Sequence, residues 1–300
     1  MDRIVEMTAF VAVAEAQSFS AAAKKLGLSP PTITRTLSAL EDRLHARLLV
    51  RTTRSVRLTD AGQNFLDDAR RILGGIAEAE QAVAGARVIA RGALRMTAPV
   101  LFGEMFVLPL LRDFLSAHPQ LTARLMLLDR VVNIVEEGID IALRIGRFED
   151  GGLQSIELGS VRRMLVAAPG YLAAHGSPRQ PADLQSHRLT MSVGNDASHE
   201  WRFGAGPGTP PTSVRVEPTL TVSTLRAAID SAREGWAITR VLSYQVRDDL
   251  RAGRLVGVLE DVEPAPLPVC LVFPHSRRPS AKLMAFIDLA SERLAAVLAA

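Results

Sequence analysis

The sequence predicts an α+β chain of several domains, in which an N-terminal winged helix-turn-helix precedes a linker helix and a two-lobed α/β domain. Two short helical patterns meet at a glycine near the start, an apolar repeat in steps of four and three follows, and apolar strands then alternate with helices. The expected boundaries are 1–59 for the first domain, 60–90 for the linker and 91–300 for the last domain. Within the last domain, one lobe covers about 91–162 and 266–300, and the other about 163–265.

The composition is that of an ordinary globular protein, since 48% of the 300 residues are hydrophobic and 22% are charged. No apolar run reaches the length that crosses a bilayer. Asp2, Glu6 and Glu15 argue against a secretory signal, which needs a basic start and an unbroken apolar core. Cys270 is the single cysteine, which excludes an internal disulfide and a cysteine-pair zinc site. These features predict a cytoplasmic protein with no membrane partner.

Basic residues concentrate in one short segment. Between Ser20 and Thr59 eight lysines and arginines stand against two acidic residues, so this segment carries +6 while the whole chain carries +3. The remainder therefore sums to −3. A basic segment on a slightly acidic protein favours a polyanionic partner for that segment. A solvated basic face without a partner remains the alternative from charge alone.

The first two helices are predicted from apolar spacing and from capping residues. One helix face carries Ile4, Met7, Val11 and Ala14. A second helix runs from Phe19 or Ser20 to Leu26, with Ser18 or Ser20 as its cap. Gly27 then permits a tight turn that a side chain would hinder.

A third helix begins with two prolines. Ser29 caps it, and Pro30 and Pro31 suit its first turn, where backbone N–H groups lack helical partners. Its buried stripe consists of Ile33, Leu37, Leu40 and Leu44. The polar residues off this stripe suit the major groove of DNA, where hydroxyls meet base edges or phosphates and arginine binds guanine with two hydrogen bonds. The candidate DNA-binding residues of this helix are Ser29, Pro31, Thr32, Thr34, Arg35 and Ser38. An ordinary helical hairpin with a hydroxyl-rich face is the alternative.

The segment Leu48 to Thr59 predicts two short strands around a turn, which would form the wing. Arg51, Arg54 and Arg57 recur at every third residue, so they crowd one ribbon and can grip phosphates. With Thr53, these arginines complete the candidate DNA-binding set.

An apolar repeat after Asp60 predicts the linker helix. It runs through Phe65, Ala69, Ile72, Ile76, Ala79, Val83 and Ala86 in steps of four and three. The residues Phe65, Ala69, Ile72, Ile76, Ala79 and Val83 are the candidate dimerisation residues, facing a partner helix. The alternative is an amphipathic helix that lies on its own domain. Gly74 and Gly75 weaken the middle of the helix.

The last two hundred residues predict an α/β domain with a largely parallel sheet in each lobe. The first set comprises a strand at ALRMT, a helix over 102–119, a strand over 121–128, a helix over 130–138 and a strand over 139–146. A second set follows, and VCLVFP with a last helix from Ala281 to about Ala299 returns to the first lobe. The stretch 203–213 is rich in Gly and Pro and predicts a surface loop.

Ligands in such folds bind at the carboxyl ends of strands, between the lobes. The candidate effector-binding residues at those ends are Thr97, Pro99, Val100, Gly103, Asp129, Arg144, Gly146, Arg147, Ser223 and Thr224. Free N–H groups at helix starts and the charge of Arg144 or Arg147 suit a carboxylate. The alternative is that these arginines pair with Asp129, Glu149 or Asp150.

Many N-terminal positions follow one known pattern at fixed spacing. They are Phe19-Ser20-Ala21-Ala22-Ala23, Leu26, Ser29, Pro31, Thr34-Arg35, Leu40-Glu41, Leu44, Arg51, Arg54, Leu58-Thr59 and Ala61-Gly62. With these residues the segment resembles the N-terminal domain of LysR-type transcriptional regulators. Two positions depart from the family, because Leu49 stands where Phe is usual and Pro30 stands where a polar residue is common. Pro30 offers no donor to a base.

The C-terminal part resembles the effector-binding domain of the same family, which is itself similar to periplasmic solute-binding proteins. The matching phrases are Gly138 to Gly146, Ala168 to Gly176 and Pro181-Ala182-Asp183-Leu184. One departure is Gly235-Trp236-Ala237-Ile238, where the family often has Gly-x-Gly-Ile, and the bulky Trp236 is expected to alter the nearby loop and cleft. The resemblance also implies that the linker helix pairs two subunits.

These observations predict a DNA-binding transcriptional regulator modulated by a small molecule between the two lobes. Its expected partners are double-stranded DNA, an effector such as an organic acid, further copies of itself in a homodimer or homotetramer, and RNA polymerase. No cofactor or metal is expected, because the six histidines are scattered and nucleotide-binding or nucleophile motifs are missing. Cys270, within LPVCLVF, is expected to be a buried small hydrophobe. A solute-binding transport component and an enzyme are the rival interpretations.

Overall fold

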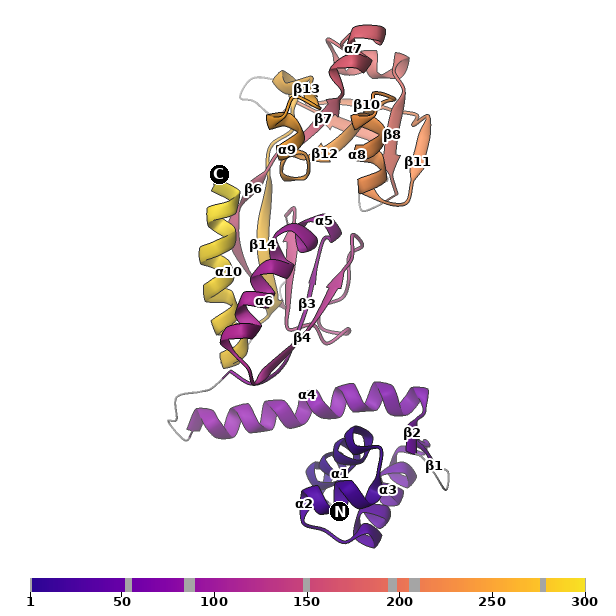
Figure 1. The fold of residues 1–300 in the computed structure, drawn as a ribbon, viewed down its shortest axis with the longest axis vertical. Helices are drawn as coiled ribbons and strands as arrows, with labels where there is room; N and C mark the ends of the chain where they lie inside the picture. The colour runs from indigo at the N-terminus through magenta and orange to yellow at the C-terminus, as the bar shows by residue number, and fades with distance from the viewer. Residues whose placement is uncertain are drawn as a thin grey trace. The chain divides into compact units, whose positions relative to one another are not determined.

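The computed structural model describes residues 2–51, 56–83, 90–147, 152–193, 199–204, 211–275 and 279–299 of the chain. It divides into two compact units, Met1–Ile89 and Ala90–Ala300. The N-terminal unit contains α1 (Arg3–Ala16), α2 (Phe19–Leu26), α3 (Pro30–Leu44), β1 (Leu49–Arg51), β2 (Val56–Leu58) and α4 (Asp60–Val83), as Figure 1 shows.

The caps and turns of the N-terminal unit confirm its predicted helix-turn-helix. Ser18 accepts the N–H of Ala21 and Ser29 accepts that of Thr32, so each oxygen satisfies a donor that the helix itself leaves unpaired. Gly27 ends α2 at φ +66°, in the left-handed region that other residues enter at a cost. These local features fix the angle at which α3 follows α2.

The core of this unit lies between α1, α3 and the hairpin. Its fully buried side chains include Phe10, Ile33, Leu37 and Leu40. The predicted apolar face of α1 is partly wrong, because Ile4 is 43% exposed while Phe10 and Val13 are fully buried. The buried face of α1 is therefore rotated away from the face that the spacing of three and four indicated.

The first half of α4 packs on its own unit. Leu66 and Ala69 belong to the core, Phe65 and Leu73 pack against it, and the rings of Phe65 and Phe10 lie 5.3 Å apart. For Phe65 and Ala69 the structure thus shows an intramolecular contact in place of the predicted partner helix, because α1 supplies the apolar surface that they face. The side chains of Ala79 and Val83 lie outside the described residues.

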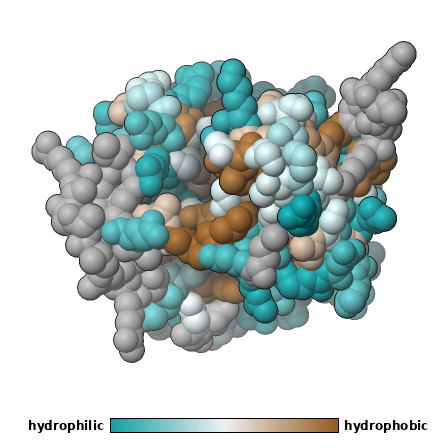
Figure 2. Space-filling view, turned by 90° about the horizontal axis from the view of Figure 1, so that it is seen from below, coloured by the Kyte–Doolittle hydropathy of each residue, from teal (hydrophilic) through white to brown (hydrophobic). Residues whose placement is uncertain are grey.

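The remaining candidates on α4 have a different environment. Ile72 is 40% exposed and Ile76 is half-buried. In Figure 2, which is seen from below, the coloured surface carries many hydrophilic residues, and hydrophobic residues show near its middle. Ile72, with Ile4 and Val5, is among the apolar side chains that the described part of this unit exposes.

The C-terminal unit contains two five-stranded sheets, one in each lobe. The first lobe comprises β3 (Gly92–Ala98), α5 (Val100–Phe102), a π-helical turn (Gly103–Val107), α6 (Leu108–Ala117), β4 (Leu121–Leu127), β5 (Ile141–Ile145), β6 (Leu153–Val161), β14 (Leu267–Pro274) and α10 (Ala281–Ala299). The second lobe comprises β7 (Arg163–Ala167), α7 (Pro169–His175), β8 (Leu189–Ser192), β9 (Glu200–Phe203), β10 (Thr212–Arg215), β11 (Leu220–Val222), α8 (Leu225–Arg233), β12 (Ile238–Leu242), α9 (Arg247–Arg251) and β13 (Val256–Val258), with short 3₁₀ turns at Pro181–Ser186, Ser243–Gln245 and Glu260–Val262.

The sheets are mixed, which corrects the prediction of largely parallel sheets. In the first lobe the order is β4-β3-β5-β14-β6, in which β14 runs antiparallel to both neighbours. In the second lobe the order is β11-β8-β12-β7-β13, in which β7 runs antiparallel to both neighbours. The strands β6 and β13 were not predicted, and they supply the antiparallel edges.

One predicted helix is wrong. The segment 130–138 forms a turn, in which the side-chain oxygen of Asn133 accepts the N–H groups of Val135 and Glu136. Such local bonds compete with helical ones, and the β-branched neighbours disfavour a helix. The predicted surface loop over 203–213 begins in β9 and ends in β10, which pair with each other as an antiparallel hairpin.

The second lobe is inserted into the first. The chain leaves the first lobe after β6 and returns at β14, where Val161 and Leu267 pair across the ladder. Aromatic contacts also join the lobes, since the Tyr244 ring lies 5.1 Å from that of Phe102 and 5.9 Å from that of Phe106. The apolar core of the first lobe consequently continues through Tyr244 and Val241 into the second.

Candidate nucleic-acid interface and ligand cavity

The polar face of α3 is exposed. Thr32, Thr34 and Arg35 lie at the surface, while Ser38 is half-buried near the core stripe. Ser29 and Pro31 are exposed in the first turn. The structure therefore brings the six candidate residues of this helix onto or beside one face.

The hydroxyl groups of this face are held in place locally. The Ser29 and Thr32 hydroxyl oxygens lie 2.7 Å apart, and the Thr34 hydroxyl donates to the carbonyl of Pro30 at 3.0 Å. Each hydroxyl keeps acceptor capacity for a further donor. Arg35 has no side-chain partner among the described residues and projects a free guanidinium group, which can bind a base or a phosphate.

The predicted wing is a two-stranded antiparallel hairpin in which Val50 pairs with Arg57. Arg57 is exposed on β2. Thr53 and Arg54 lie outside the described residues, and so does the side chain of Arg51. The base of the hairpin is fixed by Glu41 on α3, which is buried and accepts the N–H groups of Leu48 and Leu49 at 2.8 and 3.0 Å.

Gly62 on α4 allows the chain at the start of the hairpin to approach this helix closely. A Cβ atom at this position would lie 2.0 Å from the carbonyl oxygen of Leu48, so only glycine permits the approach. Thr59 adds a hydroxyl that accepts the N–H of Gly62 and donates to the carbonyl of Arg47. The helix-turn-helix and the hairpin therefore form one unit.

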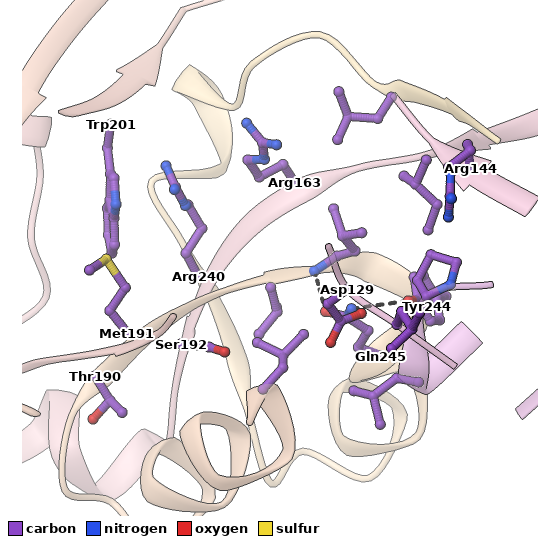
Figure 3. A pocket seen from close by; sticks show the side chains of 18 residues that line it. Asp129, Arg144, Arg163, Thr190, Met191, Ser192, Trp201, Arg240, Tyr244 and Gln245 are labelled. Atoms are coloured by element: carbon purple, nitrogen blue, oxygen red, sulfur yellow. Dashed lines mark hydrogen bonds between the residues drawn. The ribbon is translucent and has the colours of Figure 1, made fainter. Parts of the chain in front are cut away.

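The C-terminal unit contains a cavity of about 190 Å³ between its lobes (Figure 3). Its charged lining residues are Asp129, Arg144, Arg163 and Arg240, and its uncharged polar ones are Thr190, Ser192, Tyr244 and Gln245. Its aliphatic lining includes Leu101, Leu128, Ile145, Leu225, Leu242 and Leu267. Three arginines thus stand against one carboxylate in an otherwise largely apolar space.

Three of the residues predicted to bind an effector line this cavity, namely Pro99, Asp129 and Arg144. Val100 lies beside it and donates its N–H to Asp129 at 3.0 Å. The first N–H of this helical segment is therefore already satisfied by a carboxylate of the protein, which corrects the expectation that it is open to a ligand.

The other predicted effector residues lie elsewhere. Thr97 is fully buried in β3, and Gly103 packs so closely that an added Cβ would lie 2.2 Å from Leu127. Gly146 donates its N–H to the carbonyl of Pro268, and Arg147 is exposed. Ser223 and Thr224 are exposed, and Thr224 caps α8 by accepting the N–H of Ala227. None of these residues lines the cavity.

Arg144 extends from β5 into the cavity. The Nε and Nη2 atoms of its guanidinium group are buried and have no hydrogen-bond partner among the described residues, and Nη1 makes one long contact of 3.5 Å with the carbonyl of Leu143. Burial lowers the pKa of Arg144 from its usual value. Burial disfavours the charged form of a base, so a ligand that carries negative charge would be favoured here.

Aromatic groups form two parts of the wall that the sequence did not reveal. Tyr244 is buried, and burial raises the pKa of its hydroxyl well above the usual range, so this group stays neutral. Its oxygen accepts from the Gln245 side chain at 3.1 Å. Trp201 is also buried, and the guanidinium carbon of Arg240 lies 4.5 Å from the centre of its ring. Trp236, which was expected to affect the cleft, does not line the cavity and lies beside Arg188.

Cys270 is buried in β14, as predicted. Burial raises the pKa of its thiol, which leaves little of the reactive thiolate. Within the described residues no group of three or more His, Cys, Asp and Glu side chains is arranged to hold a metal ion. No helix in the described parts of the chain is long and apolar enough to span a bilayer.

Comparison with known families decides what this architecture is. Residues 4–63 match the bacterial regulatory helix-turn-helix protein model of the lysR family, and residues 89–295 match the LysR substrate binding domain. The chain belongs to the LysR family of transcriptional regulators. It is accordingly a DNA-binding regulator with an effector-binding C-terminal domain, and the resemblance seen in its sequence is confirmed.

Individual LysR relatives match over nearly the full length. An uncharacterized regulator of Escherichia coli, YhjC, is 32% identical over 96% of each chain. A transcriptional repressor of Pseudomonas aeruginosa is 32% identical, with 98% of this chain and 93% of the relative covered.

Solved LysR structures match the fold as well. The regulator CrgA of Neisseria meningitidis is 28% identical with a TM-score of 0.61, covering 97% of this chain and 98% of that one. The virulence activator AphB of Vibrio cholerae is 27% identical with a TM-score of 0.60, covering 96% and 98%. The helix-turn-helix unit and the two-lobed regulatory unit described above are therefore those of the LysR family.

Proposed function

We propose that this LysR-family regulator binds a two-fold related DNA site as a homodimer or homotetramer and responds to a small organic acid in the cavity between its lobes. The exposed residues of α3 would read bases in the major groove, and arginines of the hairpin would contact phosphates. A regulator bound beside a promoter acts on RNA polymerase, so polymerase is the further partner in this proposal. The chain would act where the DNA is, in the cytoplasm.

The observation that carries the effector class is the charge of the cavity. Arg144, Arg163 and Arg240 line it together with a single carboxylate, Asp129, and that carboxylate already accepts the N–H of Val100. An organic anion would neutralise the buried guanidinium group of Arg144, whereas a cation would be repelled by it. Because much of the lining is aliphatic, an anion with a carbon skeleton fits the cavity better than a fully hydrated inorganic ion.

The effector would act by binding two arrangements of the oligomer unequally, because a ligand with equal affinity for both would shift nothing. A ligand that contacts both lobes favours one relative position of these lobes. This change would then alter the spacing of the paired DNA-binding units. The proposal assigns regulation and no catalytic step to the cavity, since nucleophile and base are not paired among the lining residues.

The test uses the full-length protein and DNA from the region upstream of its own gene. We expect saturable binding in fluorescence anisotropy at low salt, and weaker binding to a shuffled duplex of equal length. Small organic acids added at millimolar concentration should change the footprint or the bend of the bound DNA. Equal affinity for both duplexes would contradict sequence-specific binding, and an unchanged footprint with every acid would contradict the effector class.

A further inference from the structure

We infer that the effector is a small organic acid with two polar ends, whose carboxylate binds Arg144 in the first lobe and whose second polar group binds Ser192 and Trp201 in the second lobe. This inference rests on the proposed function and adds the shape and functional groups of the ligand. In Figure 3, Arg144 and Trp201 lie at opposite ends of the cavity, with Asp129 and Arg240 between them.

The first-lobe end of the cavity presents an open cation. The two charged groups that influence Arg144 are Glu137 and Arg130, and these pair with each other at 3.4 Å. Arg144 is therefore not neutralised by a carboxylate of its own. Its unpartnered Nε and Nη2 atoms form one side of the planar fork that fits the two oxygens of a carboxylate.

The second-lobe end presents hydrogen-bonding groups beside Arg240, whose guanidinium carbon lies 4.5 Å from the centre of the Trp201 ring. Trp201 is 1% exposed, and its indole Nε1, a donor only, is buried with no acceptor within the described ranges. A buried donor without a partner destabilises the empty site, so an acceptor on a ligand is favoured there. Ser192 at the end of β8 has no side-chain partner among the described residues, and its hydroxyl points to the side on which Asp129 lies in Figure 3.

The middle of the cavity is apolar and short. Leu101 and Leu128 from the first lobe and Leu225 and Leu242 from the second line it. The volume of about 190 Å³ equals that of about six water molecules in the liquid, which leaves room for roughly six to ten non-hydrogen atoms. The ligand class is therefore a compact hydroxy, keto or dicarboxylic acid with an apolar centre.

The two ends belong to different lobes, and this determines which ligands change the structure. A simple acid that binds Arg144 contacts one lobe with its polar group, whereas an acid with a second polar group holds both lobes. Only the second kind has a large difference in affinity between two lobe positions, which is the condition for a regulatory effect.

The binding experiment compares matched probes on the full-length protein by isothermal titration calorimetry. One series contains adipate, hexanoate and 1,6-hexanediol, and the other contains 4-hydroxybenzoate, benzoate and 4-hydroxybenzamide. In at least one series we expect the acid with two polar ends to bind at least 10-fold more tightly than both comparators. Three results would overturn the inference. In both series the acid with one polar end could bind as tightly as the acid with two polar ends, the uncharged compound could bind more tightly than the acids, or no acid could bind at all.

Variants then assign each end. We expect Arg144→Gln to weaken the binding acid about 10- to 100-fold, and Arg112→Gln on the outer face of α6 to leave the affinity unchanged. Ser192→Ala and Trp201→Phe should each weaken the acid with two polar ends about 2- to 10-fold and leave its analogue with one polar end unaffected. Arg144→Lys keeps the charge if the glutamine variant does not fold, and it should lose less affinity.

A readout without ligand separates this inference from the proposed function. All five variants should bind the upstream DNA as the wild type does, because none lies in the N-terminal unit. If the wild type binds DNA specifically and responds to an acid, but the affinity for this acid is unchanged by Arg144→Gln, the inference is wrong and the proposed function stands. If the wild type does not bind DNA specifically, the proposed function fails, whatever the titrations show.

Discussion

Glu41 near the end of α3 accepts the backbone N–H of Leu48 at 2.8 Å, and the same oxygen accepts that of Leu49 at 3.0 Å. The glutamate is 5% exposed, so α3 and the hairpin share one buried carboxylate. This contact gives a physical role to the Leu40-Glu41 pair of the family pattern. The carboxylate satisfies two N–H groups at the point where the chain turns into the hairpin.

Replacing Glu41 by Ala should therefore destabilise the N-terminal unit. Two backbone N–H groups would lose a charged acceptor, and we expect the free energy of unfolding to fall by about 2–4 kcal/mol. Chemical denaturation of the full-length protein, followed by circular dichroism, measures this change. Arg47→Gln is the matched control, because Arg47 lies 3.8 Å from Glu41 and is 82% exposed, so its loss should cost less than about 1 kcal/mol. Equal effects of the two changes would refute the structural role of Glu41.

Arg35→Ala should weaken binding to the specific DNA site by about 1–3 kcal/mol and relax the preference at one base pair. The reason is that Arg35 is exposed on α3 and has no partner in the part of the chain that the structure describes, so its guanidinium is available to a base edge. Anisotropy titrations against a set of sites with single base changes measure both effects. A uniform loss over all sites would assign Arg35 to a phosphate contact.

Arg57→Gln should weaken binding to specific and shuffled DNA alike. Arg57 is exposed on β2, and one lost phosphate contact should reduce the slope of log affinity against log salt by about one unit. Titrations at four salt concentrations give this slope for the variant and for the wild type. Identical slopes would remove Arg57 from the phosphate contacts, and Arg54 would then be the next arginine of the hairpin to test.

Ile72→Glu should dissociate the oligomer without unfolding the N-terminal unit. Ile72 is 40% exposed on α4. A glutamate at this position is therefore tolerated in a monomer, whereas burying its charge against a partner helix is costly. Sedimentation velocity at micromolar concentration should show a shift to a smaller species. Phe65→Ala is the contrasting variant, because Phe65 packs on Phe10 and its loss should lower the unfolding free energy by about 2–3 kcal/mol. An unchanged sedimentation coefficient for Ile72→Glu would place the subunit contact elsewhere.

The second lobe should lose stability in acid through Asp249. Hydrogen bonds from Arg233 at 2.7 and 3.0 Å, and then from Arg254, hold the pKa of this carboxyl below its ordinary value of 3.8. The folded state therefore binds fewer protons than the unfolded state, so the stabilisation is present above about pH 4–5 and is lost as pH falls below 3.8.

The variant Asp249→Asn tests this pH dependence. It should lower the unfolding free energy by about 2–3 kcal/mol at pH 7 and by less at pH 3, where the wild type has lost part of the same contribution. Thermal unfolding from pH 7 to pH 3 measures the difference. A gap between wild type and variant that widens in acid would contradict this assignment.

The DNA-binding unit could be predicted from sequence because its signals are local. Ser18, Gly27 and Ser29 act within a few residues of their own positions, and the two prolines restrict the helix start by themselves. The linker helix was predicted as an element, but the environment of Phe65 was not. Its spacing fits a partner helix and α1 equally well, and only the tertiary fold distinguishes them.

Cavity residues could be predicted from the sequence only where they stand at the end of a strand that is itself easily recognised. Asp129 and Arg144 follow or end strands whose apolar runs are clear, and both line the cavity. Trp201, Arg240 and Tyr244 come from separate elements of the second lobe, and no periodicity in the sequence brings them together. Thr224 shows the opposite case, because a cap residue at a helix start looks like a ligand site until its hydroxyl is seen to be occupied.

The pairing of Val161 with Leu267 has a consequence for synthesis on the ribosome. Strand β14 lies between β5 and β6, so the sheet that starts at Gly92 lacks an interior strand until residue 274 has emerged. The inserted lobe is fully translated by then. Chains that end at residue 266 and have been released from the ribosome should therefore protect the later-encoded lobe from protease while the earlier-encoded one is still digested.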